Sequence, residues 1–167
     1  MENFKVADLS LADHGWKKIV WAWQYMPSLQ FLYNKYKDAQ PFKGATIAAC
    51  LHLEAKTANL LLTLAHLGAT VAACGSNPLS TQDDICAALA EKGVHVYSHR
   101  GMSTREYFDY VRTVLGYKPN VIIDDGADLV ATIHKELPKL IPGILGASEE
   151  TTSGVKRLRA MRDEGVL

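Results

Sequence analysis

The sequence lacks the glycine patterns by which a nucleotide-phosphate site or a serine hydrolase is usually recognised. Neither GxGxxG nor GxxxxGK[ST] occurs among its 167 residues, and GxSxG is missing as well. The first two patterns bring backbone N–H groups close to phosphate oxygens, and the third presents a nucleophilic serine on a sharp turn. Any chemistry of this chain must therefore be sought in other polar residues.

An excess of charge of one sign and long apolar runs are also missing. The 18 basic and 18 acidic residues give a formal net charge of zero, so nothing favours binding to nucleic acid or anionic lipid. No stretch approaches the roughly 20 apolar residues of a membrane span, and the first residues lack the apolar centre of a signal peptide. We therefore expect a cytoplasmic protein without a nucleic-acid or membrane partner.

Patterns typical of metal sites and disulfide frameworks are absent too. The three cysteines, Cys50, Cys74 and Cys86, form no CxxC pair. So small and odd a number favours free, buried thiols in a reducing compartment. The six histidines are scattered along the chain, whereas zinc sites need clustered ligands. The sequence predicts no metal site.

What is present is the composition of an ordinary globular domain, with 48% hydrophobic and 22% charged residues. A chain of this length corresponds to a single domain. Residues 1–43 are predicted to hold two helices, because Asp8 and Ser10 are good capping residues and Pro27 suits the first turn of a second helix. Residues 44–167 form the predicted α/β core.

Beyond Gly44, short β-prone runs alternate with helical patterns. The apolar runs are continuous, which indicates a parallel sheet covered by helices on both faces. Right-handed crossovers then give a Rossmann-like doubly wound parallel sheet of about five strands. The strands are predicted at 45–50, 70–74, 94–97, 121–124 and 144–147. The helices are predicted at about 54–67, 81–92, 103–116, 127–137 and 151–163.

Polar clusters follow four of the five predicted strands. They are CLHLEAKTA at 50–58, GSNPLSTQDD at 75–84, IIDDGAD at 122–128 and GASEETTSG at 146–154. In an open α/β sheet, ligands bind at the carboxyl ends of the strands. Asp125 and Glu150 are therefore expected side by side at the mouth of one crevice, where paired carboxylates suit proton transfer or the binding of a diol.

Each cluster also has an explanation that needs no ligand. In that interpretation, His52 caps a helix beside a solvated ion pair, and Ser80 or Thr81 caps the following helix. One aspartate of DDGAD and a capping box in SEETTSG would account for the other two clusters. The two explanations are compatible, because one residue can cap a helix while its neighbours bind. The recurrence of such clusters at four strand ends favours a ligand site.

These segments resemble the S-adenosylhomocysteine hydrolases (adenosylhomocysteinases). Motifs of this length in family order are far more specific than a single glycine pattern. The form HLEAKTA is more similar to bacterial and archaeal members than to animal ones. The matching segments are VADLSLADHG at 6–15, MPSL at 26–29, CLHLEAKTA at 50–58, GSNPLSTQDD at 75–84, IIDDGADL at 122–129 and ASEETTSGVKRL at 147–158.

The resemblance implies an activity and a cofactor. Members of the family reversibly cleave S-adenosylhomocysteine to adenosine and homocysteine, and a bound NAD oxidises the ribose 3′ carbon so that the 4′ proton becomes acidic. This chain resembles the substrate-binding domain alone, over residues 1–167, and the NAD-binding domain is expected to be absent from it. We therefore expect that this polypeptide by itself cannot complete the redox cycle.

The resemblance also implies roles for individual residues. The catalytic residues would be Asp125 in proton transfer, Glu150 on the ribose hydroxyls and His52 near the 5′ leaving group. The run Thr151, Thr152 and Ser153 matches the hydroxyls that reach NAD. Whether adenosine or inosine is preferred stays open. The implied substrate-binding residues are His52, Glu54, Thr57, Asn77, Ser80, Thr81, Gln82, Asp125 and Glu150.

Three functions stay open at this point. The first is the substrate-binding half of a hydrolase, completed by further chain or by a separate NAD-domain subunit. The second is a stand-alone nucleoside or S-adenosylhomocysteine binding protein without hydrolase activity, and the third is a relative with an empty pocket. The retained Asp125, Glu150 and His52 favour the first two. An unpaired sheet edge, where the next family strand belongs, predicts a homodimer or a weak oligomer.

Overall fold

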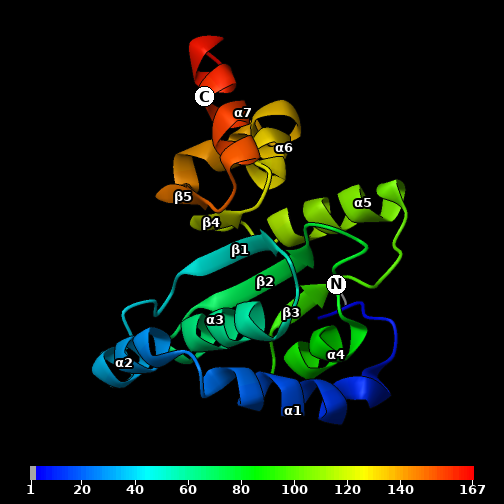
Figure 1. Ribbon diagram of the computed structural model, residues 1–167. Coiled ribbons are helices and arrows are strands. Elements are labelled where there is room, and N and C mark those ends of the chain that lie inside the picture. The colour runs from blue at the N-terminus through cyan, green and yellow to red at the C-terminus, as the bar shows by residue number, and fades with distance from the viewer. Residues whose placement is uncertain (1–2) are drawn as a thin grey trace.

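The computed structural model describes residues 3–167 and has one sheet between layers of helices (Figure 1). The chain begins with a short 3-10 helix, η1 (Leu9–Leu11), followed by α1 (Ala12–Trp23) and α2 (Pro27–Tyr36). Asp8 caps η1 by accepting a hydrogen bond from Ser10 N at 2.9 Å, and Pro27 is the first residue of α2. The predicted helix pair is confirmed. Ser10 lies inside η1 and caps neither helix.

The rest of the chain alternates strands and helices as predicted. The strands are β1 (Thr46–Leu51), β2 (Thr70–Gly75), β3 (His95–Tyr97), β4 (Val121–Asp124) and β5 (Gly146–Glu149). The helices are α3 (Ala55–His66), α4 (Asp83–Glu91), α5 (Thr104–Leu115), α6 (Asp128–Glu136) and α7 (Thr152–Asp163), with a 3-10 helix η2 (Pro138–Gly143) before β5. Gly68, Gly93 and Gly165 follow α3, α4 and α7 with φ of 103°, 86° and 71°, as glycines at helix ends do.

Strand β5 begins two residues later than the predicted 144–147. The segment before it winds into η2, which contains Pro142, and Ile144 N still donates to Ile141 O at 3.0 Å. The shift makes Glu149 the last residue of the strand, in register with Asp124 of β4. Because of this register, Glu149 is the residue paired with β4, and Glu150 lies beyond the last strand pair.

The five strands are parallel and lie in the order β3-β2-β1-β4-β5. The chain runs outward from β1 to β3 and then returns to place β4 on the other side of β1. The carboxyl ends of β1 and β4 therefore form a topological switch point, the usual ligand site of doubly wound sheets. The predicted Rossmann-like class is confirmed.

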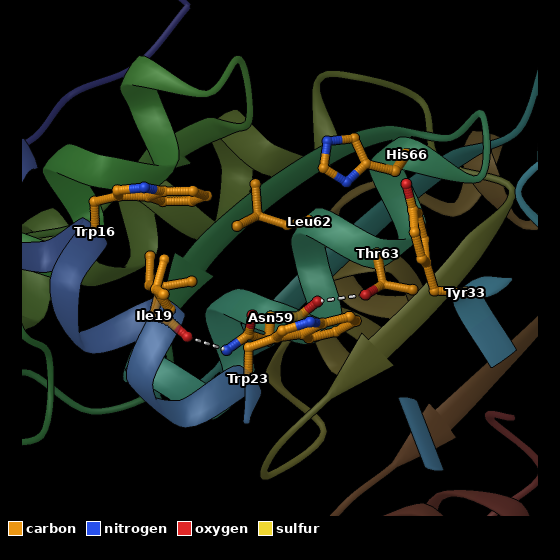
Figure 2. A pocket seen from close by; sticks show the side chains of 9 residues that line it. Trp16, Ile19, Trp23, Tyr33, Asn59, Leu62, Thr63 and His66 are labelled. Carbon is orange, nitrogen blue, oxygen red and sulfur yellow. Dashed lines mark hydrogen bonds between the residues drawn. The ribbon is translucent and has the colours of Figure 1, made fainter. Parts of the chain in front are cut away.

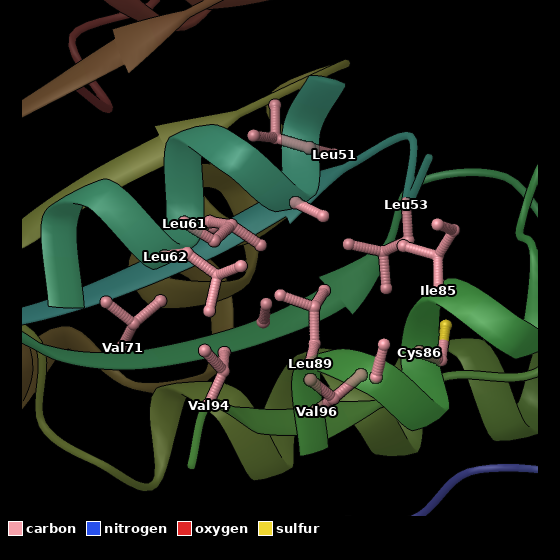
Figure 3. Close-up of a cluster of buried hydrophobic side chains, with 14 of the residues drawn as sticks. Leu51, Leu53, Leu61, Leu62, Val71, Ile85, Cys86, Leu89, Val94 and Val96 are labelled. Atoms are coloured by element: carbon pink, nitrogen blue, oxygen red, sulfur yellow. The ribbon is translucent and has the colours of Figure 1, made fainter. Parts of the chain in front are cut away.

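Two apolar cores cover the two faces of the sheet. On one face, α3 and α4 supply Leu61, Leu62, Ile85 and Leu89 (Figure 3), and α1 lies outside them with Ile19. On the other face, α5 and α6 cover the same strands. Strands β1 and β2 are buried on both sides, so the loops that leave their carboxyl ends start from fixed positions. No helix among residues 3–167 combines the length and the apolar character needed to cross a membrane.

Candidate functional site

Three polar side chains meet at the switch point. His52 follows β1, Ser76 follows β2 and Asp125 follows β4. The Asp125 Oδ2 atom lies 3.1 Å from His52 Nε2 and accepts a hydrogen bond from Ser76 Oγ at 2.8 Å. Asp125 is 12% exposed at its side chain and His52 is 43% exposed. One largely buried carboxylate therefore joins three strand ends, at the edge of the sheet where ligands of this fold bind.

The second nitrogen of His52 also has a partner. Its Nδ1 lies 2.5 Å from Ser80 Oγ, and the same hydroxyl donates to Asn77 O at 3.2 Å. The imidazole therefore bridges a hydroxyl and a carboxylate. A neutral ring has one donor and one acceptor nitrogen, so the tautomer decides which of these two contacts receives the ring proton.

The loop after β2 is held by its own polar groups. Asn77 Oδ1 accepts from Leu79 N at 2.8 Å, and Thr81 Oγ1 donates to Asn77 O at 3.0 Å. Thr81 is completely buried. Its hydroxyl and that of Ser80 are turned to Asn77, so the interpretation in which one of them caps α4 is wrong. The residue at the N-cap is Gln82, without a side-chain cap hydrogen bond.

Gln82 faces a polar hollow of about 520 Å³ between α1 and the loops after β2 and β3. Its Oε1 accepts from Lys18 Nζ at 3.2 Å. Beside it, Asp84 Oδ2 lies 2.6 Å from both Lys18 Nζ and His14 Nδ1. Burial by itself would raise the pKa of Asp84, but the hydrogen bonds from Lys18 and His14 outweigh it and the pKa is lowered. These contacts fasten α1 to α4.

Glu54 and Thr57 lie at the start of α3. Glu54 is the N-cap residue, and its Oε1 accepts from Lys56 N at 3.0 Å and from Thr57 N at 2.9 Å. The Thr57 hydroxyl lies 3.4 Å from the same oxygen. The cap of this helix is thus Glu54 and not His52, which is turned to the switch point instead.

Asp124, the last residue of β4, is a buried carboxyl group directly behind Asp125. Its oxygens accept from Asp125 N at 3.2 Å and from Val130 N at 3.1 Å. The pKa of Asp124 is raised to about 7, because burial, with the neighbouring Glu149 adding to it, outweighs the lowering effect of the two backbone hydrogen bonds. The N-cap residue of α6 is Ala127, without a side-chain cap hydrogen bond, so no aspartate of DDGAD is the N-cap residue, although Asp124 takes one N–H of the first turn.

Glu149 accepts three backbone hydrogen bonds. They come from Gly126 N, Ala127 N and Thr151 N, each at 2.9 Å. The first two belong to the turn between β4 and α6, and the third belongs to the turn between β5 and α7. The carboxylate therefore lies between the N-termini of two helices, where negative charge is favourable.

Glu150 lies one residue further along and is exposed. Its N–H donates to Asp124 O at 2.9 Å, which places its backbone level with Asp125 on the adjacent strand end. The sequence predicted this neighbourhood of the two strand ends. The exposed side chain of Glu150 is free of the backbone contacts that occupy Glu149.

The hydroxyl run starts α7. Thr151 caps the helix, since its Oγ1 accepts from Ser153 N at 3.3 Å and lies 3.0 Å from Ser153 Oγ. The side chains of Thr152 and Ser153 are exposed. The capping box considered for this segment is absent, because Thr151 caps α7 without a glutamate partner. Hydroxyls and free N–H groups at a helix start suit a polar ligand.

An apolar hollow of about 270 Å³ lies away from the strand ends, among α1, α2 and α3 (Figure 2). It is lined by Trp16, Trp23, Tyr33 and His66 together with Asn59, whose Nδ2 donates to Ile19 O at 2.9 Å. None of the candidate site residues lines it. Trp21, from the same helix α1, is 63% exposed.

Metal ligands and thiols offer no second site in the described part of the chain. Among residues 3–167, no group of three His, Cys, Asp or Glu side chains is placed to hold a metal ion. Cys50, Cys74 and Cys86 are free and buried, which confirms the expectation of buried thiols. The polar contacts described above lie at the carboxyl ends of β1, β2, β4 and β5.

Sequence reasoning missed three residues of this arrangement. Ser76, Asp124 and Glu149 all lie within the polar clusters but were not singled out. The signal that could have found Glu149 is the pair of helix starts on either side of β5, whose unpaired N–H groups need acceptors. For Ser76 the only signal was its place directly after a strand.

Comparisons with known proteins agree with this geometry. A family model described as S-adenosyl-L-homocysteine hydrolase matches residues 3–140. The adenosylhomocysteinase of Thermococcus kodakarensis is 56% identical over 166 residues, which is 99% of this chain and 39% of the relative. The adenosylhomocysteinase of Aquifex aeolicus is 49% identical over 166 residues, or 99% of this chain and 40% of the relative.

A relative of a different name is similar to the same extent. The S-inosyl-L-homocysteine hydrolase of Methanothermobacter thermautotrophicus is 51% identical over 164 residues, covering 98% of this chain and 39% of the relative. The chain thus spans about two fifths of the length of the curated relatives it matches. On the match of the family model and on these identities, the chain belongs to the S-adenosyl-L-homocysteine hydrolase family.

Proposed function

We propose that this chain binds the nucleoside part of S-adenosylhomocysteine or S-inosylhomocysteine, as the substrate-binding half of a hydrolase that releases homocysteine. The observation that carries the proposal is the contact of Asp125 with His52 and Ser76 at the switch point. These three residues come from three strand ends, so the fold itself brings them together. Homology supports the same function, because relatives named adenosylhomocysteinase and S-inosyl-L-homocysteine hydrolase match nearly the whole chain.

The proposed roles follow from the accessibility of each group and from the contacts that it already makes. Asp125 is partly accessible and keeps oxygen lone pairs beyond its contacts, so it accepts and returns the ribose 4′ proton. His52 bridges Asp125 and Ser80, and it holds the proton that passes to and from the 5′ position. Glu150 is exposed beside Asp125, and its carboxylate accepts hydrogen bonds from the ribose hydroxyls.

The base would lie toward the start of α3. Glu54 and Thr57 are half-buried there, and Glu54 keeps a second carboxylate oxygen beyond the one used in capping. Loop residues Asn77 and Gln82 border the same end of the sheet. Curated relatives are named both as adenosylhomocysteinases and as S-inosyl-L-homocysteine hydrolases, so adenosine and inosine are both candidate ligands.

The cofactor of the proposed enzyme is NAD, which supplies the oxidation and later reduction of the ribose 3′ carbon when it is bound. The residues of this chain that fit it are Thr151, Thr152 and Ser153. Their hydroxyls gather at the start of α7 with the Thr151 and Ser153 oxygens 3.0 Å apart, and hydroxyl and N–H donors suit the amide or hydroxyls of a dinucleotide. The remaining NAD contacts would have to come from further protein.

Calorimetric titration of the chain with adenosine, inosine and S-adenosylhomocysteine tests the proposal. We expect heat with at least one of the three, and a loss of affinity of at least tenfold in Asp125→Asn. The exposed Asp13→Asn in α1 serves as the matched control and should bind like the parent chain. A chain that binds none of the three ligands contradicts the proposal.

Hydrolysis distinguishes the proposed half-enzyme from a stand-alone binding protein. We expect the chain with added NAD to release no homocysteine thiol from S-adenosylhomocysteine, and to do so only after a protein that supplies the NAD contacts is added. Such a protein would be the separate NAD-domain partner. Release of thiol by the chain and NAD alone would show that the site is already complete.

The free edge of β5 suits self-association. Within residues 3–167, β5 pairs with β4 alone, and Gly146, Ala147 and Ser148 are exposed. Unpaired strand edges invite pairing with another chain, so we propose a homodimer or a weak oligomer through this edge. Light scattering over a range of concentrations tests it, and a mass that stays monomeric at the highest concentration contradicts it.

A further inference from the structure

The carboxylate of Glu149 connects the two turns that carry the candidate catalytic carboxylates. In the turn after β4 it accepts the N–H groups of Gly126 and Ala127, and in the turn after β5 it accepts the N–H of Thr151, each at 2.9 Å. Hydrogen bonds to an ionised acceptor are stronger than neutral ones. A single side chain thus fixes two strand ends relative to each other beyond their last paired residues.

The turn after β4 needs such support. Gly126 and Ala127 have φ of 101° and 61°, the left-handed region that a non-glycine residue adopts only when its surroundings hold it there. Glu149 holds both N–H groups of these residues. Asp124 holds the N–H groups of Asp125 and Val130, so every backbone N–H from 125 to 127 is bound by a carboxylate.

Helix α7 closes over this contact. Gly154 is buried and packs against the Glu149 carboxyl group, with no room for a Cβ atom. From the same helix, Arg157 Nη1 donates to Gly126 O at 3.0 Å and to Asp128 Oδ1 at 2.6 Å. The carboxylate therefore cannot swing out to a ligand, and its three N–H partners leave it little capacity to bind one.

We propose that Glu149 is a positioning residue, which holds Asp125 and Glu150 at a fixed separation so that both engage one ribose. The inference rests on the proposed function and adds to it a residue that acts through the backbone and does not touch the ligand. It predicts that loss of Glu149 impairs recognition of the ribose hydroxyls more than binding of the base.

Two ligands distinguish this positioning role of Glu149 from a general role in stability. Adenosine carries the 2′ and 3′ hydroxyls, and 2′,3′-dideoxyadenosine has the same base without them. We compare both ligands by calorimetry in the parent chain, in Glu149→Gln and in the matched control Glu164→Gln, which alters an exposed glutamate after α7. If inosine is the ligand that binds, inosine and its dideoxy form take their place.

The expected result is a selective loss. Glu149→Gln should weaken adenosine binding about tenfold or more, as the loss of charge-assisted hydrogen bonds implies, and should change dideoxyadenosine binding less than about twofold. Glu164→Gln should match the parent with both. Equal affinities in Glu149→Gln and the parent overturn the inference alone, and so does an equal loss for both ligands. Absence of nucleoside binding by the parent overturns the proposed function and the inference with it.

A measurement on the parent chain covers the case in which Glu149→Gln does not fold. In an amide NMR titration, adenosine should shift the N–H signals of Gly126, Ala127 and Thr151. A ligand that contacts Asp125 and Glu150 should also displace the neighbouring backbone groups that Glu149 holds. Dideoxyadenosine should leave these three signals in place. Three signals that stay unmoved by adenosine, or that move equally with both ligands, overturn the inference.

Discussion

The backbone of Gly154 lies directly over the carboxyl group of Glu149, so that a Cβ atom at position 154 would overlap the carboxyl carbon and both of its oxygens. The side chain of Glu149 is fixed by three hydrogen bonds and cannot yield without losing them. Gly154→Ala should therefore lower the free energy of unfolding by about 1–3 kcal/mol, the usual cost of overpacking, when measured by urea denaturation.

The control for this substitution is Gly143→Ala. A Cβ atom at Gly143 would meet nothing within 4 Å, and its backbone is not in the left-handed region. It should change stability by less than about 0.5 kcal/mol. A Gly154→Ala protein as stable as the Gly143→Ala protein would mean that α7 does not pack on Glu149 in solution.

Asp124 should make the stability depend on pH near neutrality. Its pKa is about 7 in the folded chain against an ordinary value of 3.8, so between these values the folded state binds more protons than the unfolded state. The contribution of this group is therefore complete below about pH 4 and is lost as the pH rises through about 7. The loss is on the order of 4 kcal/mol at most.

Urea denaturation of the parent and of Asp124→Asn across this range measures that contribution. We expect the parent to lose stability from about pH 4 to about pH 7 relative to the variant, whose amide does not titrate. The difference between the two proteins, and not the slope of either alone, isolates Asp124 from other groups. A difference that stays constant with pH would contradict the raised pKa.

Asp84 should stabilise the attachment of α1. It is nearly buried and contacts the more exposed Lys18 and His14 at 2.6 Å each, so its replacement by an amide leaves these two groups without their carboxylate partner. Asp84→Asn should cost roughly 1–3 kcal/mol, and the exposed Asp13→Asn should cost almost nothing. Because the pKa of Asp84 is lowered, the contribution is present above its unfolded pKa and is lost as the pH falls through the folded value. Equal stability of Asp84→Asn and Asp13→Asn in urea would contradict this role of Asp84.

Ser76 should matter for binding and not for stability. Its hydroxyl donates to Asp125 Oδ2 at 2.8 Å, and loss of one hydrogen bond of this kind changes an affinity roughly three- to tenfold. We expect Ser76→Ala to weaken nucleoside binding in calorimetry while its thermal midpoint stays unchanged. Ser28→Ala, on the exposed side of α2, is the control. An affinity equal to that of the control would show that His52 alone orients Asp125.

The sheet was predictable because its strands carry a strong local signal. Continuous apolar runs such as that of β4 are typical of strands buried on both faces, and glycines such as Gly68 and Gly93 end the intervening helices where the pattern stops. The start of β5 was not predictable in this way. Its residues Gly146, Ala147 and Ser148 are exposed, so neither apolar pattern nor β propensity distinguishes them from the turn before.

The sequence predicted the location of the candidate site better than the contacts within it. Polar residues after strands predicted where His52 and Asp125 would lie, because the carboxyl ends of parallel strands share one edge. The sequence did not predict which of two adjacent acidic residues would bind backbone N–H groups and which would not. Whether Asp124 or Asp125, and Glu149 or Glu150, turns toward the backbone depends on register between β4 and β5, which the sequence of a single strand does not encode.

The occupied start of α6 has a consequence for which ligands can enter. In nucleotide-binding sheets of this class, the first N–H groups of a helix receive the phosphates. Here the protein's own carboxylates, Glu149 and Asp124, already take the N–H groups of Gly126, Ala127 and Val130, and the Asp125 carboxylate lies beside them. A phosphate group at this turn would meet carboxylates where other sheets of this class offer N–H donors, so we expect the proposed site to favour an uncharged nucleoside over its phosphorylated form.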